Sequence, residues 1–271
     1  MEFFTAEKIS PRVTRIRDIL GVGMYLVEGD YSACLIDTGY GLGNVRDFVE
    51  SLTDKPVFVI LTHGHVDHAG AASLWDEVWL NPLDLDVYAR HSDLGFRRRH
   101  FEEHEETKWI PGSEYVPART EPFLSLYDGQ VFHLGGVTLE MIGTPGHTPG
   151  MTMVLIREER MIIFGDGCGL QVLLIFPDSG ILSEYRRTLL KLKKYEDFYD
   201  RILRNHGTCE SPKELLDNCI DCCTDILAGT DAAEKVNFGE IKAFSARALD
   251  GNLMRADGRQ GNIWYTEDKR R

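Results

Sequence analysis

Short apolar runs recur along the chain, most of them either continuous or alternating with polar residues, and this pattern predicts β-strands. The runs fall into two sets, with a richly charged segment at about 82–120 between them. Longer amphipathic segments predict helices at about 44–52 and 184–194. The first set of strands is expected at 13–16, 24–27, 33–36, 57–61 and 78–80, and the second at 137–142, 151–156 and 161–164.

The end of the chain has a different pattern. Ser211 is a residue type that caps helices and Pro212 one that opens them, so a helix is predicted over 211–229. Apolar segments at 236–244 and 261–265, separated by the turn-rich stretch 250–261, predict an extended hairpin. Three aromatic residues of this tail are expected to pack on the core, with a dimer contact or a pocket wall as alternatives: Phe244, Trp264 and Tyr265.

Length and composition fit one compact folded unit. A chain of 271 residues with 43% hydrophobic content can bury a substantial core. We expect a catalytic domain over 1–210, with 211–271 packed against it. The formal net charge of −13 disfavours nucleic acid as a partner, because a binder needs a basic surface to displace counterions from phosphates.

Membranes are also disfavoured as partners. No stretch approaches the roughly 20 consecutive apolar residues of a membrane span. Residues 1–10 carry charges among their few apolar residues and lack the apolar core of a signal peptide, so a cytoplasmic location is expected.

The six cysteines fit that reducing compartment. Three of them, Cys219, Cys222 and Cys223, share one face of the predicted helix, and no Cys-x-x-Cys partner exists elsewhere for a metal site. We therefore expect them to pack as small apolar residues. Cys168 follows Asp166 by two residues, so it would line a pocket, ligate a metal or pack; lining or packing is preferred.

The most informative polar cluster follows the apolar run 57–61. His63, His65, Asp67 and His68 lie within six positions at the end of a predicted strand. Where the chain is still extended, residues i and i+2 point to the same side, so His63 and His65 can converge on one ion. The alternative is a polar loop with clustered histidines. Packing alone does not select this composition, because an aspartate is almost never fully buried without a partner.

Three more candidate ligands follow later strands. His147 lies in a Gly- and Pro-rich turn after 137–142, Asp166 lies between two glycines after 161–164, and His206 precedes Gly207 after a short apolar stretch. Glycine permits a sharp turn at each of these places. The sequence therefore predicts seven ligand-type side chains at strand ends.

In order and spacing, these residues resemble the metallo-β-lactamase fold superfamily. The match includes His-x-His-x-Asp-His at 63–68, the later His147, Asp166 and His206, and the segment Leu35-Ile-Asp-Thr-Gly39. It extends from about the first strands to His206. The resemblance implies an α/β fold of the αββα sandwich type, in which two mixed β-sheets face each other and helices cover the outside.

The resemblance also implies a division of the ligands between two metal ions. Imidazole nitrogen and carboxylate oxygen suit Zn²⁺, Fe and Mn²⁺, and zinc is our first expectation. Asp37 would support the site from behind the ligands. The implied assignment is His63, His65 and His147 for one ion, Asp67, His68 and His206 for the second, and Asp166 as the bridge between them.

The implied chemistry is hydrolysis by a metal-bridging hydroxide, which Asp67 orients, acting as nucleophile on a small-molecule ester, thioester, lactone or phosphoester. Two alternatives stay open. One is an iron-dependent persulfide dioxygenase, because the superfamily also contains such enzymes. The other is a non-catalytic metal-binding protein.

Substrate specificity is expected in the two segments that the resemblance explains least. Residues 82–120 are interpreted either as a solvated helical excursion or as a substrate lid. In a lid, Arg97, Arg98 or Arg99 would contact an anionic substrate. The tail looks different from the helical glutathione-binding segment of the glyoxalase II branch, and a homodimer contact there is possible.

Overall fold

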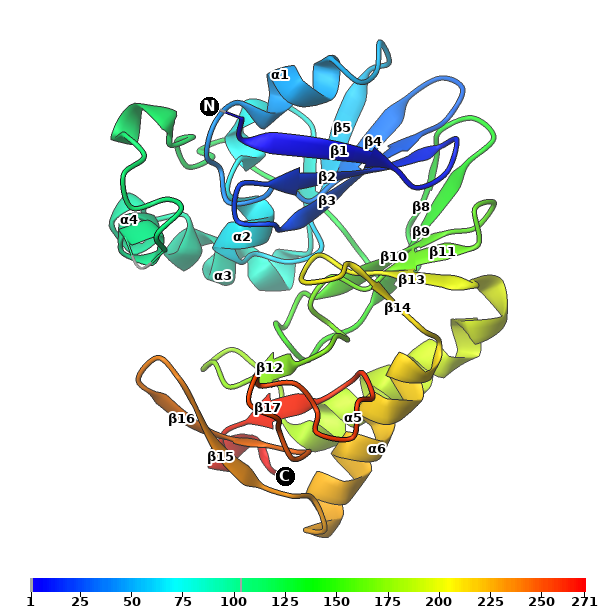
Figure 1. Ribbon diagram of the computed structural model, residues 1–271. Coiled ribbons are helices and arrows are strands. Elements are labelled where there is room, and N and C mark those ends of the chain that lie inside the picture. Colours follow the sequence, from blue (N-terminus) through cyan, green and yellow to red (C-terminus); the bar gives the residue numbers. More distant parts are fainter. Residues whose placement is uncertain (1, 103) are drawn as a thin grey trace.

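The structure is a computed structural model that describes residues 2–102 and 104–271. Within these residues the strands form a seven-stranded, a six-stranded and a four-stranded sheet (Figure 1). In the seven-stranded sheet, β1 to β4 are antiparallel and β4 to β7 are parallel, so the sheet is mixed. Its strands lie in chain order: β1 (Phe4–Lys8), β2 (Val13–Asp18), β3 (Gly23–Glu28), β4 (Ala33–Ile36), β5 (Val57–Ile60), β6 (Val78–Leu80) and β7 (Leu124–Ser125).

The six-stranded sheet has the order β14-β13-β11-β10-β9-β8. It is also mixed, because β11 and β13 pair in parallel while the other neighbours are antiparallel. Its strands are β8 (Val131–His133), β9 (Thr138–Gly143), β10 (Thr152–Ile156), β11 (Met161–Ile163), β13 (Arg201–Leu203) and β14 (Glu210–Ser211).

Three apolar clusters define the layers of the sandwich. One joins the facing surfaces of the two sheets, and includes Ile36 from β4 and Val154 from β10. A second packs the outer face of the first sheet against α1 (Val45–Glu50). The third packs the outer face of the second sheet against α5 (Leu182–Leu192) and α6 (Glu214–Ala228). The αββα sandwich expected from the sequence is confirmed.

Up to residue 229, the predicted helices and strands agree with the structure except at one helix. Each expected strand is present within one or two residues of its predicted ends, and Asn44 caps α1 by accepting a hydrogen bond from the backbone N–H of Asp47. The predicted start of the last helix is wrong. Ser211 belongs to β14, and its hydroxyl contacts Arg204 and Gln260 instead of capping a helix, so α6 begins at Glu214. Its end at Gly229 follows the prediction, with a positive φ of 70°.

The tail builds the third sheet, in the order β12-β17-β16-β15. The expected antiparallel pairing of the two tail segments is present between β16 and β17, but the first segment, 236–244, is not one strand: it turns at Gly239 and forms a hairpin of its own from β15 and β16. Trp264 and Tyr265 are buried and Phe244 packs beside them, which is the core-docking role. The sheet consists of β12 (Val172–Leu174), β15 (Glu234–Phe238), β16 (Ile241–Ser245) and β17 (Ile263–Tyr265).

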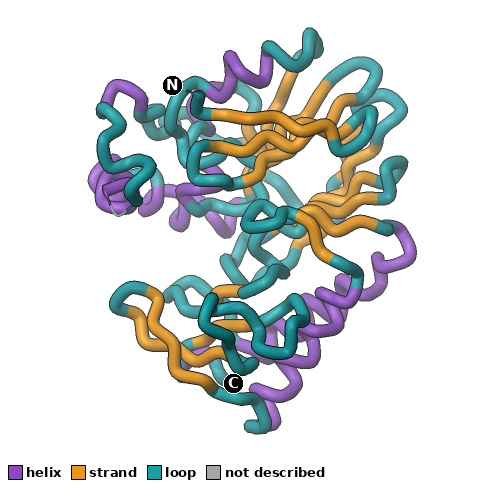
Figure 2. The backbone as a smooth tube through the Cα atoms, viewed as in Figure 1, coloured by secondary structure: helices purple, strands orange, loops and turns teal. Residues whose placement is uncertain are grey.

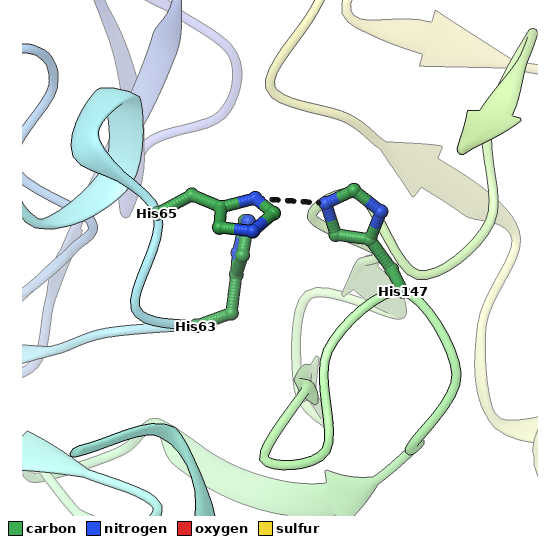
Figure 3. A group of neighbouring side chains, drawn as sticks. All are labelled: His63, His65 and His147. Carbon is green, nitrogen blue, oxygen red and sulfur yellow. Dashed lines mark hydrogen bonds between the residues drawn. The ribbon is translucent and has the colours of Figure 1, made fainter. Parts of the chain in front are cut away.

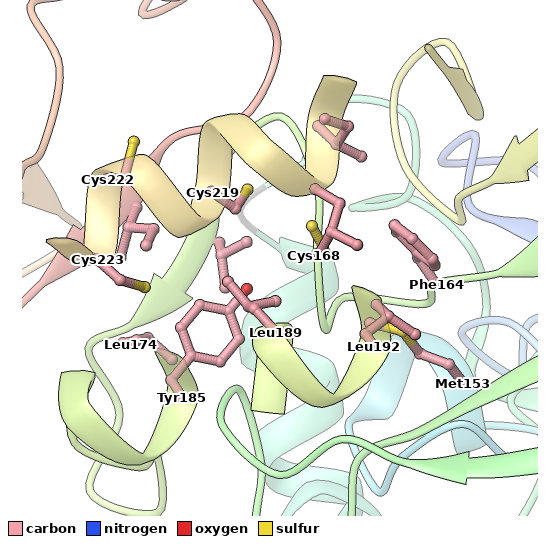
Figure 4. Close-up of a cluster of buried hydrophobic side chains, with 14 of the residues drawn as sticks. Met153, Phe164, Cys168, Leu174, Tyr185, Leu189, Leu192, Cys219, Cys222 and Cys223 are labelled. Atoms are coloured by element: carbon pink, nitrogen blue, oxygen red, sulfur yellow. The ribbon is translucent and has the colours of Figure 1, made fainter. Parts of the chain in front are cut away.

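The cysteines pack as expected. All six are buried and none forms a disulfide. Figure 4 shows Cys168, Cys219 and Cys223 among apolar side chains near the ring of Tyr185, whereas Cys222 points away from that ring. Burial raises the pKa of the Cys222 thiol to about 12, so it stays protonated at neutral pH. Cys168 belongs to this core, which settles its role as packing.

The segment 82–120 is a compact helical excursion, shown at the left of Figures 1 and 2. Residue 103, within it, lies outside the described residues. Its helices are α3 (Leu85–His91) and α4 (Leu94–Glu102), close to the short α2 (Val66–Ala69) that carries two candidate ligands. The chain also has 3-10 helices at Ala72–Leu74, Pro82–Asp84, Gly112–Glu114, Lys193–Phe198 and Glu267–Lys269.

Arg97 is fully buried inside this excursion, so its predicted contact with substrate is wrong. Its guanidinium donates hydrogen bonds to the backbone carbonyls of Tyr40, at 3.1 Å, and Gly41, at 2.8 Å, and to that of Val116. Gly41 has a φ of 73°, and a Cβ there would lie 2.2 Å from the carbonyl oxygen of Gly70. Arg97 thus fastens the excursion to a tight glycine turn.

None of the helices among residues 2–102 and 104–271 is both long and apolar enough to cross a membrane.

Replacing Arg97 by Met is expected to destabilise the protein by about 2–4 kcal/mol, because three buried carbonyls lose their donor. Chemical denaturation measures the change. Arg98→Met, on the exposed face of the same helix, is the matched control and is expected to change stability by less than about 0.5 kcal/mol. Equal stability of the two variants would contradict the anchoring role of Arg97.

Candidate metal centre

Strand ends from both sheets bring the seven candidate ligands to one edge of the sandwich. His63 and His65 follow β5, and Asp67 and His68 lie on α2 directly after them. The other three come from the second sheet, where His147 lies between β9 and β10, Asp166 follows β11 and His206 follows β13. Within the described residues, their ligand atoms form two compact groups: His63, His65 and His147, and Asp67, His68, Asp166 and His206.

The first group consists of buried imidazoles. Nδ1 of His65 lies 3.0 Å from Nε2 of His147, and the rings of His63 and His65 are 4.7 Å apart (Figure 3). Within the described residues, Nε2 of His63 is buried without a hydrogen-bond partner. A buried polar atom left unpaired costs free energy, and three converging imidazole nitrogens are a donor set that suits a divalent metal ion. The group therefore fits one such ion.

The second group mixes carboxylates with imidazoles. Nε2 of His206 lies 3.1 Å from Oδ2 of Asp67 and 3.3 Å from Oδ1 of Asp166. Nε2 of His68 lies 3.4 Å and 3.5 Å from the same two oxygens. Four nitrogen and oxygen donors that face one point suit zinc, iron or manganese.

Asp166 lies between the two groups. Its Oδ1 faces His68 and His206, whereas its Oδ2 lies 3.8 Å from Nε2 of His147 in the first group. Each carboxylate oxygen is thus directed to a different group. This is the arrangement that a carboxylate needs to contact two ions at once.

Asp37 supports the second group through hydrogen bonds to its carboxylate. Its buried carboxylate accepts hydrogen bonds from Nδ1 of His68 at 2.8 Å, from Nδ2 of Asn205 at 2.8 Å and from the backbone N–H of Thr62 at 2.7 Å. A carboxylate can only accept here, so Nδ1 of His68 carries a proton and Nε2 is the nitrogen that faces the site. Asp37 also has a φ of 64°, a sparsely populated conformation for a non-glycine residue.

Asp84 has the matching role for the first group, and the sequence did not single it out. It accepts hydrogen bonds from the backbone N–H of Gly64 at 2.9 Å, the Thr148 hydroxyl at 2.7 Å and the backbone N–H of Gly150 at 2.6 Å. These donors lie on the two loops that carry His63, His65 and His147. One buried carboxylate therefore joins the loops, although burial raises its own pKa.

The two groups differ in protonation. Burial and the neighbouring imidazoles lower the pKa of His63 well below its usual value, so its ring is neutral and ready to ligate. In the second group burial opposes charge, yet Asp166 and Asp67 raise the pKa of His206 to about 10. Burial likewise opposes ionisation of Asp67, but His68 and His206 hold its pKa well below the usual range. A cation entering the second group would displace protons from these imidazoles.

A cavity of about 450 Å³ opens onto both groups. On one side it is lined by the excursion, through His91, Phe96 and His100, and by Tyr40, whose hydroxyl lies 2.8 Å from Nε2 of His100. Sequence reasoning missed Tyr40 because it lies in a glycine-rich turn without a ligand pattern. On the opposite side the lining comes from the second half of the chain: Leu170, Gln171, Leu173, Phe176, Phe238 and Met254.

Arg98 and Arg99 are exposed on α4. Within the described part of the chain, neither belongs to the residues that line this cavity. The excursion borders the cavity through histidine and phenylalanine side chains instead.

This fold and ligand set define a class of protein. A family model described as the metallo-beta-lactamase superfamily matches residues 18–199, which is more than half of the chain. The chain belongs to this superfamily, and the resemblance found in the sequence is confirmed.

Among curated relatives, the acyl-coenzyme A thioesterase MBLAC2 of Bos taurus is 25% identical over 251 residues, covering 83% of this chain and 75% of that protein. The Homo sapiens protein of the same name is 24% identical over the same length. The atrochrysone carboxyl ACP thioesterase of Aspergillus terreus is 28% identical over 172 residues, covering 59% of this chain and 45% of that protein.

Solved structures agree on the fold. The inverting sec-alkylsulfatase Pisa1 from Pseudomonas sp. superimposes with a TM-score of 0.65 at 17% identity, covering 83% of this chain but 42% of that protein. A metallo-beta-lactamase from Pontibacter korlensis gives a TM-score of 0.61 at 17% identity and covers 82% and 99% of the two chains. At these identities the likeness concerns the fold alone.

Replacing Asp37 by Asn is expected to weaken metal binding by about 10–100-fold, because the amide has a single acceptor oxygen for the donors of His68, Asn205 and Thr62. Metal content after dialysis against a chelator of known affinity measures the loss. Asp54→Asn, an exposed carboxylate beyond α1, is the matched control. Unchanged metal affinity in the Asp37 variant would show that this carboxylate does not support the ligands.

Proposed function

We propose that this chain is a metal-dependent hydrolase of acyl thioesters that uses two divalent metal ions, with zinc as the first expectation. The observation that carries the proposal is the position of Asp166, whose two oxygens face two separate ligand groups. The proposed ligands are His63, His65 and His147 for one ion, Asp67, His68 and His206 for the other, and Asp166 for both.

When bound, such ions supply Lewis acidity and lower the pKa of water to about 7. The protein contributes orientation and proton transfer. Asp67 is held ionised, so its carboxylate can accept a proton from the attacking water and orient it toward the thioester carbonyl. The new C–O bond forms as the C–S bond breaks, and the thiolate takes up the released proton. The histidines fix this geometry because Asp37 and Leu173 hold their outward-facing nitrogens.

The thioester class rests on the relatives. Proteins named as thioesterases match this chain over 251 residues at 24–25% identity and over 172 residues at 28% identity. The printed names differ in the thiol carrier, coenzyme A in one case and an acyl carrier protein in the other. We therefore extend only their shared feature, the thioester bond, to this chain.

Asp67→Ala is expected to lower kcat for thioester hydrolysis by about 10²–10⁴-fold while the fold survives, because the variant lacks the proton acceptor and one ligand. Release of free thiol from acyl thioesters measures turnover, and circular dichroism monitors the fold. Asp86→Ala, an exposed carboxylate at the start of α3, serves as the control. Undiminished turnover in the Asp67 variant would contradict its proposed role.

Removing metal with a chelator is expected to abolish hydrolysis and to lower the temperature of unfolding, since ions that bind the folded state stabilise it. Elemental analysis of protein purified without added metal should find two ions per chain. Restoring zinc, iron and manganese separately identifies the active metal. Full activity after metal is shown to be absent would reject the metallohydrolase proposal.

A further inference from the structure

An apolar wall lies at the side of the cavity that the second half of the chain provides. It consists of Leu173 in β12, Phe176 shortly after it, Phe238 at the end of β15, and Met254 in the loop before β17. We call these four residues the tail wall. All four side chains are uncharged, and they line the same cavity as His65, His147 and Asp166.

The tail wall is continuous with the ligands. The ring of Phe176 packs edge-on against His65, with centroids 5.5 Å apart, and against His147 at 6.0 Å. Phe238 in turn packs edge-on against Phe176 at 5.9 Å. An apolar surface therefore extends from the metal-ligating histidines outward to the tip of the tail hairpin.

Two of the four side chains are exposed to solvent. Phe238 is 43% exposed and Met254 39%, whereas Trp264 in the neighbouring strand is 4% exposed. Apolar side chains that remain exposed beside a cavity indicate a surface that a ligand covers.

The loop that carries Met254 is held in place. Gln171 donates a hydrogen bond from its side-chain amide to the backbone carbonyl of Leu253. The backbone N–H of Met254 donates to Oδ1 of Asp250 at 3.0 Å. Phe238 is held by the pairing of β15 with β16, so contacts fix both tail segments of the wall.

We propose that the tail wall is the binding site for the acyl chain of the substrate, which makes this chain selective for thioesters with an extended aliphatic acyl group. The inference rests on the proposed thioester hydrolysis. The acyl chain is the apolar part of such a substrate, and binding it along Phe176 places the carbonyl carbon beside the ligand histidines.

The polar thiol carrier of the substrate fits the tail wall less well than the acyl chain does. Among the described residues that line the cavity, Arg204 is the one arginine and there is no lysine, and its guanidinium is committed to Ser211, Thr208 and the backbone carbonyl of His206. The tail wall offers apolar contact alone. Hydrolysis adds water across the C–S bond and releases a carboxylic acid and the free thiol, so the acyl chain must leave along the same apolar surface.

The test uses the metal-replete full chain and a series of straight-chain acyl thioesters from acetyl to dodecanoyl, all carrying the same thiol, N-acetylcysteamine. For the wild-type protein, kcat/KM is expected to rise about two- to fourfold per added methylene over the first several methylenes, as a buried methylene should contribute. Phe238→Ala is expected to reduce this slope, lowering kcat/KM about tenfold for the longest chains and much less for acetyl.

Two further variants test whether the change in chain-length dependence is specific to the tail wall. Phe238→Trp should narrow the cavity and shift the preferred substrate to shorter chains. Phe198→Ala, a change of the same kind at a 44% exposed phenylalanine outside the cavity, should leave the slope as in the wild type.

The outcomes separate the two proposals. Measurable hydrolysis with no dependence on chain length would overturn the acyl-binding role of the tail wall and leave thioester hydrolysis standing. An equal loss for every chain length in Phe238→Ala would also overturn it, because a purely structural role lowers all rates alike. Failure to hydrolyse any thioester would reject the proposed function, and the tail-wall inference with it.

Discussion

The buried carboxylate of Asp37 is the contact on which the geometry of the site most depends. It accepts hydrogen bonds from Thr62 and His68, which follow β5 of the first sheet, and from Asn205, which follows β13 of the second. The facing surfaces of the two sheets pack through apolar side chains, and further hydrogen bonds join the sheets near the site, among them one from the backbone N–H of Gly23 to the backbone carbonyl of Asn205 at 2.6 Å. A charge-assisted contact has strict geometry, so this carboxylate aligns the strand ends from which the ligands project.

A second constraint follows from the crowding of ionisable groups. Five imidazoles and two carboxylates share one edge of the sandwich. Both carboxylates belong to the second ligand group, and the first group consists of imidazoles alone. In the first group burial lowers the pKa of His63 and of His65, so these rings are neutral, whereas in the second group the carboxylates hold His206 protonated. Asp166 connects these unlike environments. The site is therefore preorganised for cations on both sides, by lone pairs on one and by negative charge on the other.

The sequence predicts the sandwich well because its strands are buried and short, so that their apolar runs stand out between turns. The candidate ligands could be recognised because their residue types and order are unusual. The burial of Arg97 could not be predicted from the sequence. Three consecutive arginines on a helix point in directions about 100° apart, and the residue types do not tell which one turns inward.

Features formed by distant segments escaped prediction. β12 is a three-residue strand whose partner, β17, lies some ninety residues later in the chain, so no local pattern reveals the pairing. The cavity lining has the same origin, since Tyr40, Phe176 and Phe238 come from three separate regions. Ser211 was taken for a helix cap because its residue type permits that role, but pairing with Ile202 in β13 engages its backbone first.

The tail hairpin has an evolutionary consequence. Its outer residues reach the cavity, yet all seven candidate ligands and both supporting carboxylates lie earlier in the chain. A substitution at the hairpin tip can reshape the far end of the cavity while every ligand keeps its neighbours. Phe238 and Met254, the part of the cavity lining that comes from the tail, thus follow the last candidate ligand in the sequence, so this part of the lining can change in evolution while the candidate ligands stay the same.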